Sequence, residues 1–230
     1  MTLPITTAST QPSTTAELPS TTPPTTPAST PALTPIPGRC LNMDILFLID
    51  ESQSMLIDNG WQNMKNFILT FTATYKVITD IRFAWISFNS AIWNLTPFMS
   101  SQNFTTNVTN SVFSTGATNF ELGFNEAYNT ISSNSGPPRA SVLIFVTDGT
   151  PNAGGPISGL TNELRCQLNT TIIGLGINQD IDGANGIAQA LGVNSQDGCI
   201  QSHYHNISVY ETLVAESSPQ LEQDLHCFRD

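Results

Sequence analysis

Residues 44–50 read DILFLID, a run of five apolar residues with an aspartate at each end. Because the run is apolar at every position, it is typical of a strand buried on both faces of a parallel sheet. The polar residues 51–54, ESQS, follow it directly. The next apolar residues are spaced three or four apart, which predicts an amphipathic helix along Trp61, Met64, Ile68, Phe71, Tyr75 and Ile78. This region therefore predicts a strand, a polar loop and a helix that packs against a sheet.

The following residues repeat this alternation of strands and helices. Strands are predicted at 81–88, 141–147 and 170–176, and helices over 120–131 and near 158–168, 183–191 and 209–225. Only Asn89 and Ser90 separate 81–88 from the short segment 91–96, so these two segments form a hairpin and 91–96 is an antiparallel edge strand. A last short strand is expected near 206–209. The pattern predicts an α/β fold, a doubly wound, mostly parallel sheet with one antiparallel edge strand and helices on both faces.

Residues 1–38 differ in composition from the rest of the chain. They hold nine of the 15 prolines, interleaved with Thr and Ser, and Glu17 is their only charged residue. Such a segment lacks the apolar residues that a core needs, so we expect a disordered stalk or linker, and this composition is typical of O-glycosylated stalks. An unmodified linker is the alternative. One folded domain is expected over residues 39–230.

The overall composition excludes several partner classes. Charged residues make up 11% of the chain, below the roughly 25% of an ordinary soluble domain, and the formal net charge is -11. This charge repels phosphate backbones and anionic lipid, so nucleic acid and membrane surfaces are poor partners and cations are better ones. No apolar run approaches the roughly 18 residues of a membrane span, and no signal peptide is visible. We therefore expect a fragment of a longer protein or an incomplete gene sequence.

Cysteines and glycosylation motifs indicate an oxidising, extracellular setting. The four cysteines allow three pairings, of which position in the chain favours Cys40 with Cys227 and Cys166 with Cys199, and free buried thiols are the alternative. Five Asn-x-Ser/Thr motifs predict N-glycosylation at Asn94, Asn103, Asn107, Asn169 and Asn206. With the stalk, these features predict a secreted glycoprotein.

Oxygen-bearing side chains gather where the predicted strands end. Asp50, Ser52 and Ser54 lie at the end of the first strand, Asp148 follows the strand 141–147, and Thr118 precedes a helix. Ligands of such sheets bind beyond the carboxyl ends of the strands. Carboxylate and hydroxyl oxygens suit a hard divalent cation, Mg²⁺ foremost, with Mn²⁺ or Ca²⁺ as alternatives. The other interpretation is that these residues only cap a helix and hold a loop.

The pattern resembles the metal-ion-dependent adhesion site (MIDAS) of the von Willebrand factor type A (vWA) domain. The matching elements are Asp50-x-Ser52-x-Ser54, Thr118 after a glycine loop, and Thr147-Asp148-Gly149 at the end of a buried strand, and the resemblance covers about residues 42–228. It implies the Rossmann-like vWA fold. It also implies that Ser52 and Ser54 coordinate the metal directly, and that Thr118, Asp50 and Asp148 do so directly or through water. An open coordination position would then accept an acidic group of a protein ligand.

Two residues inside the motif depart from the family pattern. Gln53 stands where many members have glycine, and Glu51 adds a charge beside the site. Neither removes an oxygen ligand. Because alternate side chains of the loop face the site, we expect Glu51 to point away from it.

Enzymatic interpretations fit the sequence less well. A phosphoryl-transfer aspartate of the haloacid-dehalogenase type is followed two residues later by a second Asp, where this chain has Ser52. Residues 155–159, GPISG, do not match a nucleophile elbow, and residues 174–176 lack the third glycine of a dinucleotide fingerprint. His203 and His205 could indicate zinc, but only His226 stands elsewhere, so a solvated loop is expected there. We expect no enzyme.

Two functional hypotheses follow. The first is an extracellular adhesion or recognition module that binds Mg²⁺ and engages a protein ligand presenting a carboxylate. The resemblance also implies a place in a larger secreted protein, in some members beside a C-type lectin module. The second hypothesis is a structural scaffold or spacer without metal-dependent ligand capture.

Overall fold

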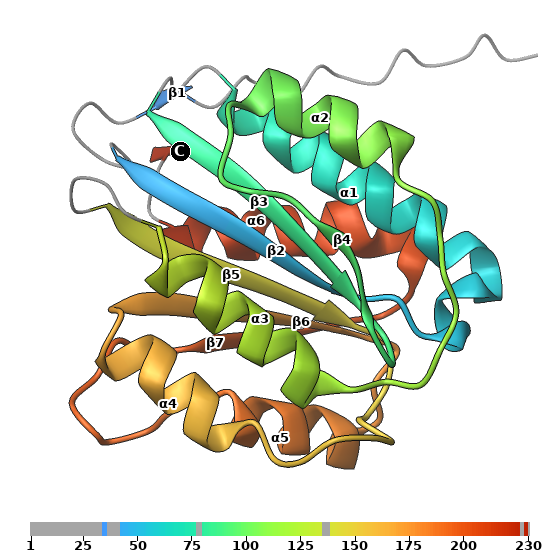
Figure 1. Cartoon of the computed structure of the whole chain (residues 1–230), viewed down its shortest axis with the longest axis vertical. Coiled ribbons are helices and arrows are strands. Elements are labelled where there is room, and N and C mark those ends of the chain that lie inside the picture. Colours follow the sequence, from blue (N-terminus) through green and yellow to red (C-terminus); the bar gives the residue numbers. More distant parts are fainter. Residues whose placement is uncertain (1–33, 36–41, 77–79, 135–138, 226–227, 230) are drawn as a thin grey trace, which may run out of the picture. The chain divides into compact units, whose positions relative to one another are not determined.

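The structure is a computed structural model that describes residues 34–35, 42–76, 80–134, 139–225 and 228–229 (Figure 1). Of the predicted stalk, only the backbone of β1 (Thr34–Pro35) is described, paired antiparallel with β8 (Phe228–Arg229). Cys40, Ile78, His226 and Cys227 lie outside the described residues, and with them the expected Cys40–Cys227 pair. None of the described helices has the length and apolar character needed to cross a membrane.

A six-stranded sheet forms the centre of the domain, in the order β4-β3-β2-β5-β6-β7. Its strands are β2 (Met43–Asp50), β3 (Ile81–Phe88), β4 (Ile92–Leu95), β5 (Ala140–Thr147), β6 (Thr170–Ile177) and β7 (His203–Ile207). All neighbours pair in parallel except β3 and β4, which form the antiparallel hairpin at one edge. The predicted fold class is confirmed.

Helices cover both faces of this sheet (Figure 1). One face carries α1 (Gly60–Tyr75), α2 (Ser101–Asn110) and α6 (Leu213–Leu225), and the other carries α3 (Phe120–Ser132), α4 (Ser158–Cys166) and α5 (Ile181–Ala190). Short 3-10 turns, η1 (Gln53–Asn59) and η2 (Tyr210–Thr212), precede α1 and α6.

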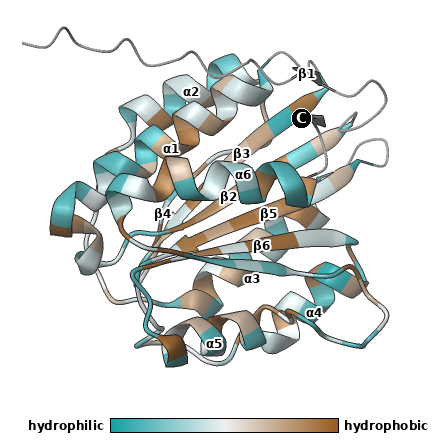
Figure 2. Ribbon diagram, turned by 180° about the vertical axis from the view of Figure 1, so that it is seen from behind, coloured by the Kyte–Doolittle hydropathy of each residue, from teal (hydrophilic) through white to brown (hydrophobic). Residues whose placement is uncertain are grey.

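Each face of the sheet has its own apolar core, which explains the continuous apolar run of β2. Phe47 belongs to the core under α1 and α2, whereas Leu46 and Leu48 belong to the core under α3. All residues of β2 are buried. In Figure 2 the strands are accordingly mostly hydrophobic, while hydrophilic residues lie on the helices.

The helix α2 is not predicted by the sequence. It contributes only Phe104 and Val108 to the core, and its other residues are mostly Asn, Thr, Ser and Gln. Two apolar residues four apart give too little periodicity to predict a helix. Both Asn103 and Asn107 are exposed on it.

The strand β7 corrects two expectations. It spans His203–Ile207 instead of residues 206–209, and His203 and His205 therefore lie in a strand and not in a solvated loop. Glycines in the neighbouring strand allow this placement, because a Cβ atom at Gly174 would lie 3.0 Å from the ring of Tyr204 and one at Gly176 would overlap its hydroxyl. The strand is polar and lies at the sheet edge, so its sequence lacks the apolar signal of the others.

Candidate metal centre

Asp50 stands at the centre of the oxygen cluster, as the last residue of β2. It is fully buried, and its Oδ1 accepts a hydrogen bond from the Ser52 N–H at 3.0 Å. Its Oδ2 accepts one from Thr147 Oγ1 at 2.7 Å. Thr147 is the last residue of β5, which pairs in parallel with β2. The carboxylate therefore joins the ends of the two central strands.

The serine hydroxyls extend this cluster to the second aspartate. Ser52 Oγ and Ser54 Oγ are 3.0 Å apart, and Ser54 Oγ donates to Asp148 Oδ1 at 2.7 Å. Four of the predicted site residues, Asp50, Ser52, Ser54 and Asp148, are thus connected through a short chain of hydrogen bonds. They come from two strand ends and converge as oxygen donors at one place.

Thr118 is held beside the cluster by its backbone. Its N–H donates to Asn152 Oδ1 at 2.9 Å, and its carbonyl accepts from the backbone N–H of Asn152 at 3.1 Å. The segment before it meets the serine loop where the Gln53 N–H donates to the Gly116 carbonyl at 3.3 Å. Within the described residues, no hydrogen bond connects the Thr118 hydroxyl to the other four residues. The Thr118 side chain is nonetheless buried in the protein and not exposed to solvent.

Burial and like charge dominate the electrostatics of this cluster. Burial, followed by the nearby charge of Asp148, raises the pKa of Asp50 to about 7, although hydrogen bonds from Thr147 and Ser52 act in the opposite direction. Among the described residues, no lysine or arginine forms an ion pair with either aspartate. Within the described part of the chain, these two neighbouring carboxylates therefore lack a cationic partner.

Glu51 turns away from the oxygen cluster, as expected, but into the protein and not toward solvent. It is fully buried, with Oε2 accepting from Ser87 Oγ at 2.5 Å and Oε1 accepting from the Ser114 N–H at 2.5 Å. Burial raises the pKa of Glu51, while these hydrogen bonds and one from Asn94 oppose the rise. Its carboxylate connects the serine loop with β3 and with the segment that carries Thr118.

Tyr210 is a neighbour of the site that the sequence did not indicate. It begins η2, is buried, and donates from its hydroxyl to Met55 Sδ at 2.5 Å. Burial, the charge of Asp148 and a hydrogen bond with Asp148 raise the pKa of Tyr210. No local motif marks this residue, because its contact depends on how the chain leaves β7. The segment that precedes the last helix therefore borders the oxygen cluster.

The predicted glycosylation site at Asn94 is partly buried. Its side chain is half-buried, and Nδ2 donates to Ser87 Oγ at 2.7 Å instead of facing water. Asn103, Asn107, Asn169 and Asn206 are exposed.

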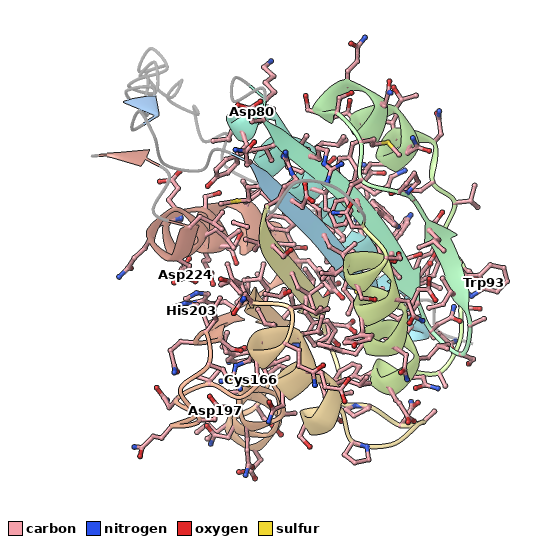
Figure 3. All side chains as sticks on the ribbon, turned by 60° about the vertical axis from the view of Figure 1, so that its left-hand side comes forward. Asp80, Trp93, Cys166, Asp197, His203 and Asp224 are labelled. Atoms are coloured by element: carbon pink, nitrogen blue, oxygen red, sulfur yellow. A yellow bond between two sulfur atoms is a disulfide. The ribbon has the colours of Figure 1, made fainter. Side chains whose placement is uncertain are left out.

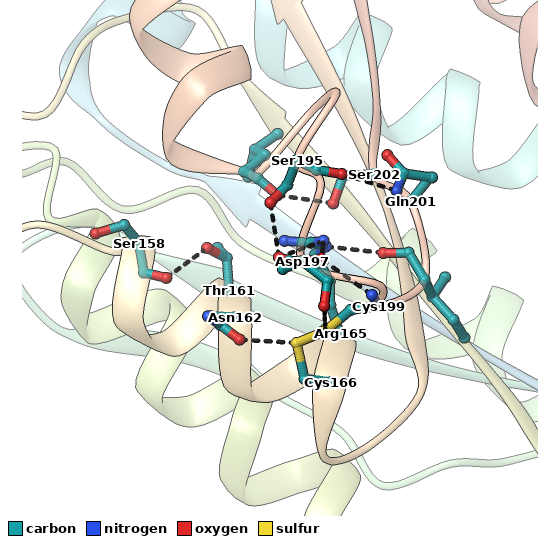
Figure 4. A network of polar contacts seen from close by, with 12 residues as sticks. Ser158, Thr161, Asn162, Arg165, Cys166, Ser195, Asp197, Cys199, Gln201 and Ser202 are labelled. Carbon is teal, nitrogen blue, oxygen red and sulfur yellow. Dashed lines mark hydrogen bonds and ion pairs between the residues drawn. A yellow bond between two sulfur atoms is a disulfide. The ribbon is translucent and has the colours of Figure 1, made fainter.

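A second polar cluster surrounds the disulfide between Cys166 and Cys199, whose Cα atoms are 4.9 Å apart (Figure 4). The buried Arg165 donates from Nη2 to both oxygens of Asp197 at 2.8 and 2.9 Å and from Nε to the Ile200 carbonyl at 2.8 Å. Hydrogen bonds from Ser195 and the Cys199 N–H, then Arg165, lower the pKa of Asp197 to about 2. With both sulfur atoms in the disulfide, this cluster anchors a loop and does not offer thiolate ligands.

Comparison with known proteins gives a family match and several similar folds. A family model described as von Willebrand factor type A domain matches residues 44–213. Proximal thread matrix protein 1 from the mussel byssus is 22% identical with a TM-score of 0.66, over 81% of this chain and 48% of that chain. This chain therefore spans about half of the mussel protein. Another structure of the mussel protein is described as having a zinc-occupied MIDAS motif.

Two bacterial surface proteins have similar folds. The PilB minor pilin of Streptococcus sanguinis is 14% identical with a TM-score of 0.65, over 84% of this chain and 64% of that chain. The pilus adhesin SpaC of Lactobacillus rhamnosus GG is 15% identical with a TM-score of 0.61, over 80% of this chain and 31% of that chain. A search of curated protein sequences finds no match.

Proposed function

The chain belongs to the von Willebrand factor type A family, and on this premise we propose that it is an extracellular recognition module. It binds Mg²⁺, or another divalent cation such as Mn²⁺ or Ca²⁺, through Asp50, Ser52, Ser54, Thr118 and Asp148. It engages a protein ligand through a carboxylate of that ligand. Its role is binding and not catalysis.

The observation that carries this proposal is the buried Asp50 beside Asp148, without a basic partner among the described residues. Burying unpaired charge is costly, and the raised pKa of Asp50 reflects that cost. A divalent cation would compensate both carboxylates. The donors present are carboxylate and hydroxyl oxygens, which are the ligands that hard cations prefer, so the residues fit the ion.

Each residue would contribute a distinct part of the site. Ser52 and Ser54 offer hydroxyl oxygens directly, while Asp50 and Asp148 supply the negative charge. Thr118 is buried and is the remaining oxygen donor. The bound cation would supply an open coordination position for a carboxylate oxygen of the ligand. Because Ser54 donates to Asp148, these oxygens already lie close together before a ligand arrives.

Exposed apolar side chains at the same end of the sheet support a protein partner. They lie in η1, in the segment before α3 and just beyond the carboxyl ends of β6 and β7, and they are Leu56, Ile57, Val112, Ile181 and Val209. Parallel strands bring these segments to one edge of the sheet, the edge that carries the oxygen cluster. Apolar side chains exposed around a polar centre are typical of protein interfaces.

A pocket lined by the loop that follows Asp148 would receive apolar parts of the partner. Its volume is about 430 Å³, and its walls are the loop that follows Asp148 and one side of α5. The apolar residues lining it include Phe120, Pro151, Pro156, Ile157 and Ile187. The ligand carboxylate and a neighbouring apolar side chain could therefore bind together.

We also propose the setting of the module. Residues 1–38 form a stalk, O-glycosylated in a secreted protein, and residues 39–230 form the vWA domain. The exposed asparagines Asn103, Asn107, Asn169 and Asn206 accept N-glycans. Cys40 and Cys227 form the second disulfide. A larger secreted protein carrying this domain, such as one with a C-type lectin module, would use the stalk as a spacer.

Selection from a displayed peptide library tests the recognition function. The full chain is immobilised in Mg²⁺, and bound peptides are recovered and sequenced. We expect the recovered peptides to carry Asp or Glu, and their binding to be lost with EDTA and in Asp148→Ala. Ile181→Ser should weaken binding, whereas Leu95→Ser, an equally sized change at another exposed site on β4, should not. Binding that withstands the chelator and Asp148→Ala would contradict the proposal.

A scaffold role is the second candidate, because one protein with a similar fold is a thread matrix protein of the mussel byssus. In that case the domain would hold a cation for stability but capture no carboxylate. Metal binding without any metal-dependent ligand in the peptide selection would favour this role.

A further inference from the structure

Two imidazoles and one carboxylate meet at the edge of the sheet, away from the oxygen cluster. His203 and His205 stand two residues apart on β7, so their side chains point to the same face of the strand. On that face lies α6, from which Asp224 points toward them. His203 Nδ1 is 3.2 Å from Asp224 Oδ1, and His205 Nε2 is 2.6 Å from Asp224 Oδ2. Figure 3 shows His203 and Asp224 side by side.

The position of this group leaves it open to solutes. β7 is an edge strand of the sheet, and no other described strand pairs with its outer side. The Asp224 side chain is 8% exposed, whereas those of His205 and His203 are 22% and 37% exposed. Among the described residues, the histidines are the only ion-pair partners of Asp224. The Asp224 carboxylate is therefore buried, whereas the two imidazoles that contact it are accessible to solvent.

We propose that His203, His205 and Asp224 form a second metal site, which takes Zn²⁺ or a similar borderline divalent ion. Imidazole nitrogen combined with one carboxylate oxygen is a donor set of zinc sites, and a set of three protein ligands leaves a position for water. The oxygen cluster at the strand ends offers no imidazole, so the two sites differ in their donor atoms. The strand β7 supplies the alternation that brings both histidines to one side, which a solvated loop would not do.

Metal binding requires a rearrangement, because one ligand atom from each of the three residues cannot yet be chosen so that all lie within 4.8 Å of one another. Each imidazole now contacts a different oxygen of Asp224, and zinc ligands lie about 2.0 to 2.2 Å from the ion around a common point. The rings therefore turn toward that point, and the exposure of His203 gives it room to do so. The ion would replace the hydrogen bonds that now connect the imidazoles to the carboxylate.

The consequence is a metal-dependent link between the edge strand and the last helix. A ligand that binds only the folded state stabilises it in proportion to the logarithm of its concentration over Kd. Zn²⁺ bound here would therefore hold α6 against β7. The domain would respond to zinc at one edge independently of the ion at the strand ends.

Zinc titration of the full chain tests this proposal. Calorimetry is carried out on Asp148→Ala in excess Mg²⁺, because zinc also accepts oxygen ligands and this background disables the oxygen cluster. We expect one equivalent of Zn²⁺ to bind, and Kd to rise at least tenfold when His205→Gln or Asp224→Asn is added. Asp182→Asn, which removes the same charge from an exposed position in the first turn of α5, should leave Kd unchanged.

A second measurement covers variants that fold poorly. In the ¹H–¹⁵N spectrum of Asp148→Ala, before further changes are added, the imidazole nitrogen signals of His203 and His205 should shift on addition of Zn²⁺. Three results would each overturn the site: no zinc binding by the Asp148→Ala protein, imidazole signals that do not shift, or equal Kd values in the folded variants. The three residues would then only form hydrogen bonds between β7 and α6. Neither measurement requires a functional oxygen cluster. A negative result would therefore contradict the zinc site without contradicting the recognition function.

Discussion

Ser54 Oγ donates a 2.7 Å hydrogen bond to Asp148 Oδ1 and so connects residues 94 positions apart in the chain. Ser54 lies just beyond β2, and Asp148 just beyond β5, the strand that pairs with it. This contact exists because the sheet is parallel and brings the carboxyl ends of its strands to one edge. The oxygens of the candidate metal site are thus gathered by the fold itself.

The buried Asp50 predicts an unusual pH dependence of metal-free stability. Its pKa is about 7 in the folded state and near 3.8 when unfolded, so the folded protein binds a proton that the unfolded chain releases between these values. The free energy of unfolding should therefore fall as pH rises from about 4 to about 7, by at most about 1.4 kcal/mol per pH unit from this group. Urea unfolding in EDTA at several pH values measures the slope.

Asp50→Asn is the control for this effect. The amide stays neutral, so the variant should lose the part of the slope that Asp50 causes, and saturating Mg²⁺ should lessen the slope in the wild type because a cation favours the carboxylate. Identical slopes for wild type and Asp50→Asn would refute the assignment to Asp50.

Glu51→Gln tests the buried connection behind the site. Both carboxylate oxygens accept hydrogen bonds, one from Ser114 N–H and one from Ser87 Oγ, and an amide keeps only one acceptor. We expect a loss of about 1 to 3 kcal/mol in unfolding free energy from the unsatisfied group. Mg²⁺ affinity should also fall, because the segment beginning at Ser114 carries Thr118. Glu126→Gln on α3 is the matched control, and equal stability of the two variants would argue against a connecting role.

Substitution of Asp44, at the opposite end of β2, should change the stability of the domain without changing its metal binding. The buried carboxylate accepts from Arg82 Nη2 and Arg139 Nε, both at 2.6 Å. Burial alone would raise the pKa of Asp44, but the two arginines outweigh it and lower the value. Its stabilising contribution is therefore present above pH 3.8 and declines as pH falls below that value.

Asp44→Ala should lower the unfolding free energy by about 3 kcal/mol, because it leaves two arginines without their carboxylate. Urea unfolding at neutral pH measures the loss, and calorimetry should give an unchanged Kd for Mg²⁺. A variant as stable as the wild type would show that the three charges contribute little.

The disulfide between Cys166 and Cys199 predicts a further stability effect. It closes a loop across a sequence separation of 33 residues, and the double change Cys166→Ser with Cys199→Ser should cost about 3 to 4 kcal/mol on loop entropy. Thermal or urea unfolding of the double variant measures it. A loss below about 1 kcal/mol would indicate that Arg165 and Asp197 anchor the loop without help from the disulfide.

The fold was predictable from sequence wherever burial leaves a strong pattern. The apolar runs of β2, β5 and β6 and the spacing of α1 identify those elements, since two-sided burial requires a continuous apolar strand. The two-residue turn after β3 likewise predicts the antiparallel β4. In contrast, α2 and β7 are mostly polar and give little apolar signal. The helix α2 was therefore not predicted, and the strand β7 was predicted with different bounds.

The candidate site was predictable only for residues that belong to a motif. Asp50, Ser52, Ser54 and Asp148 are local signals at strand ends, and the parallel sheet brings them together. Tyr210 carries no such signal, because its contact with Asp148 depends on the path from β7 to α6. The pairing of His203 and His205 with Asp224 was missed for the same reason, since it requires β7 to be a strand and α6 to lie beside it.

Calorimetric titration of Mg²⁺ into the full chain and into Asp148→Ala tests the central claim most directly. Asp182→Ala on α5 serves as the control for loss of one exposed acid. We predict one equivalent of bound Mg²⁺ in the wild type and the control, and no binding heat in Asp148→Ala. Equal heats in the wild type and Asp148→Ala would contradict the assignment of the metal site.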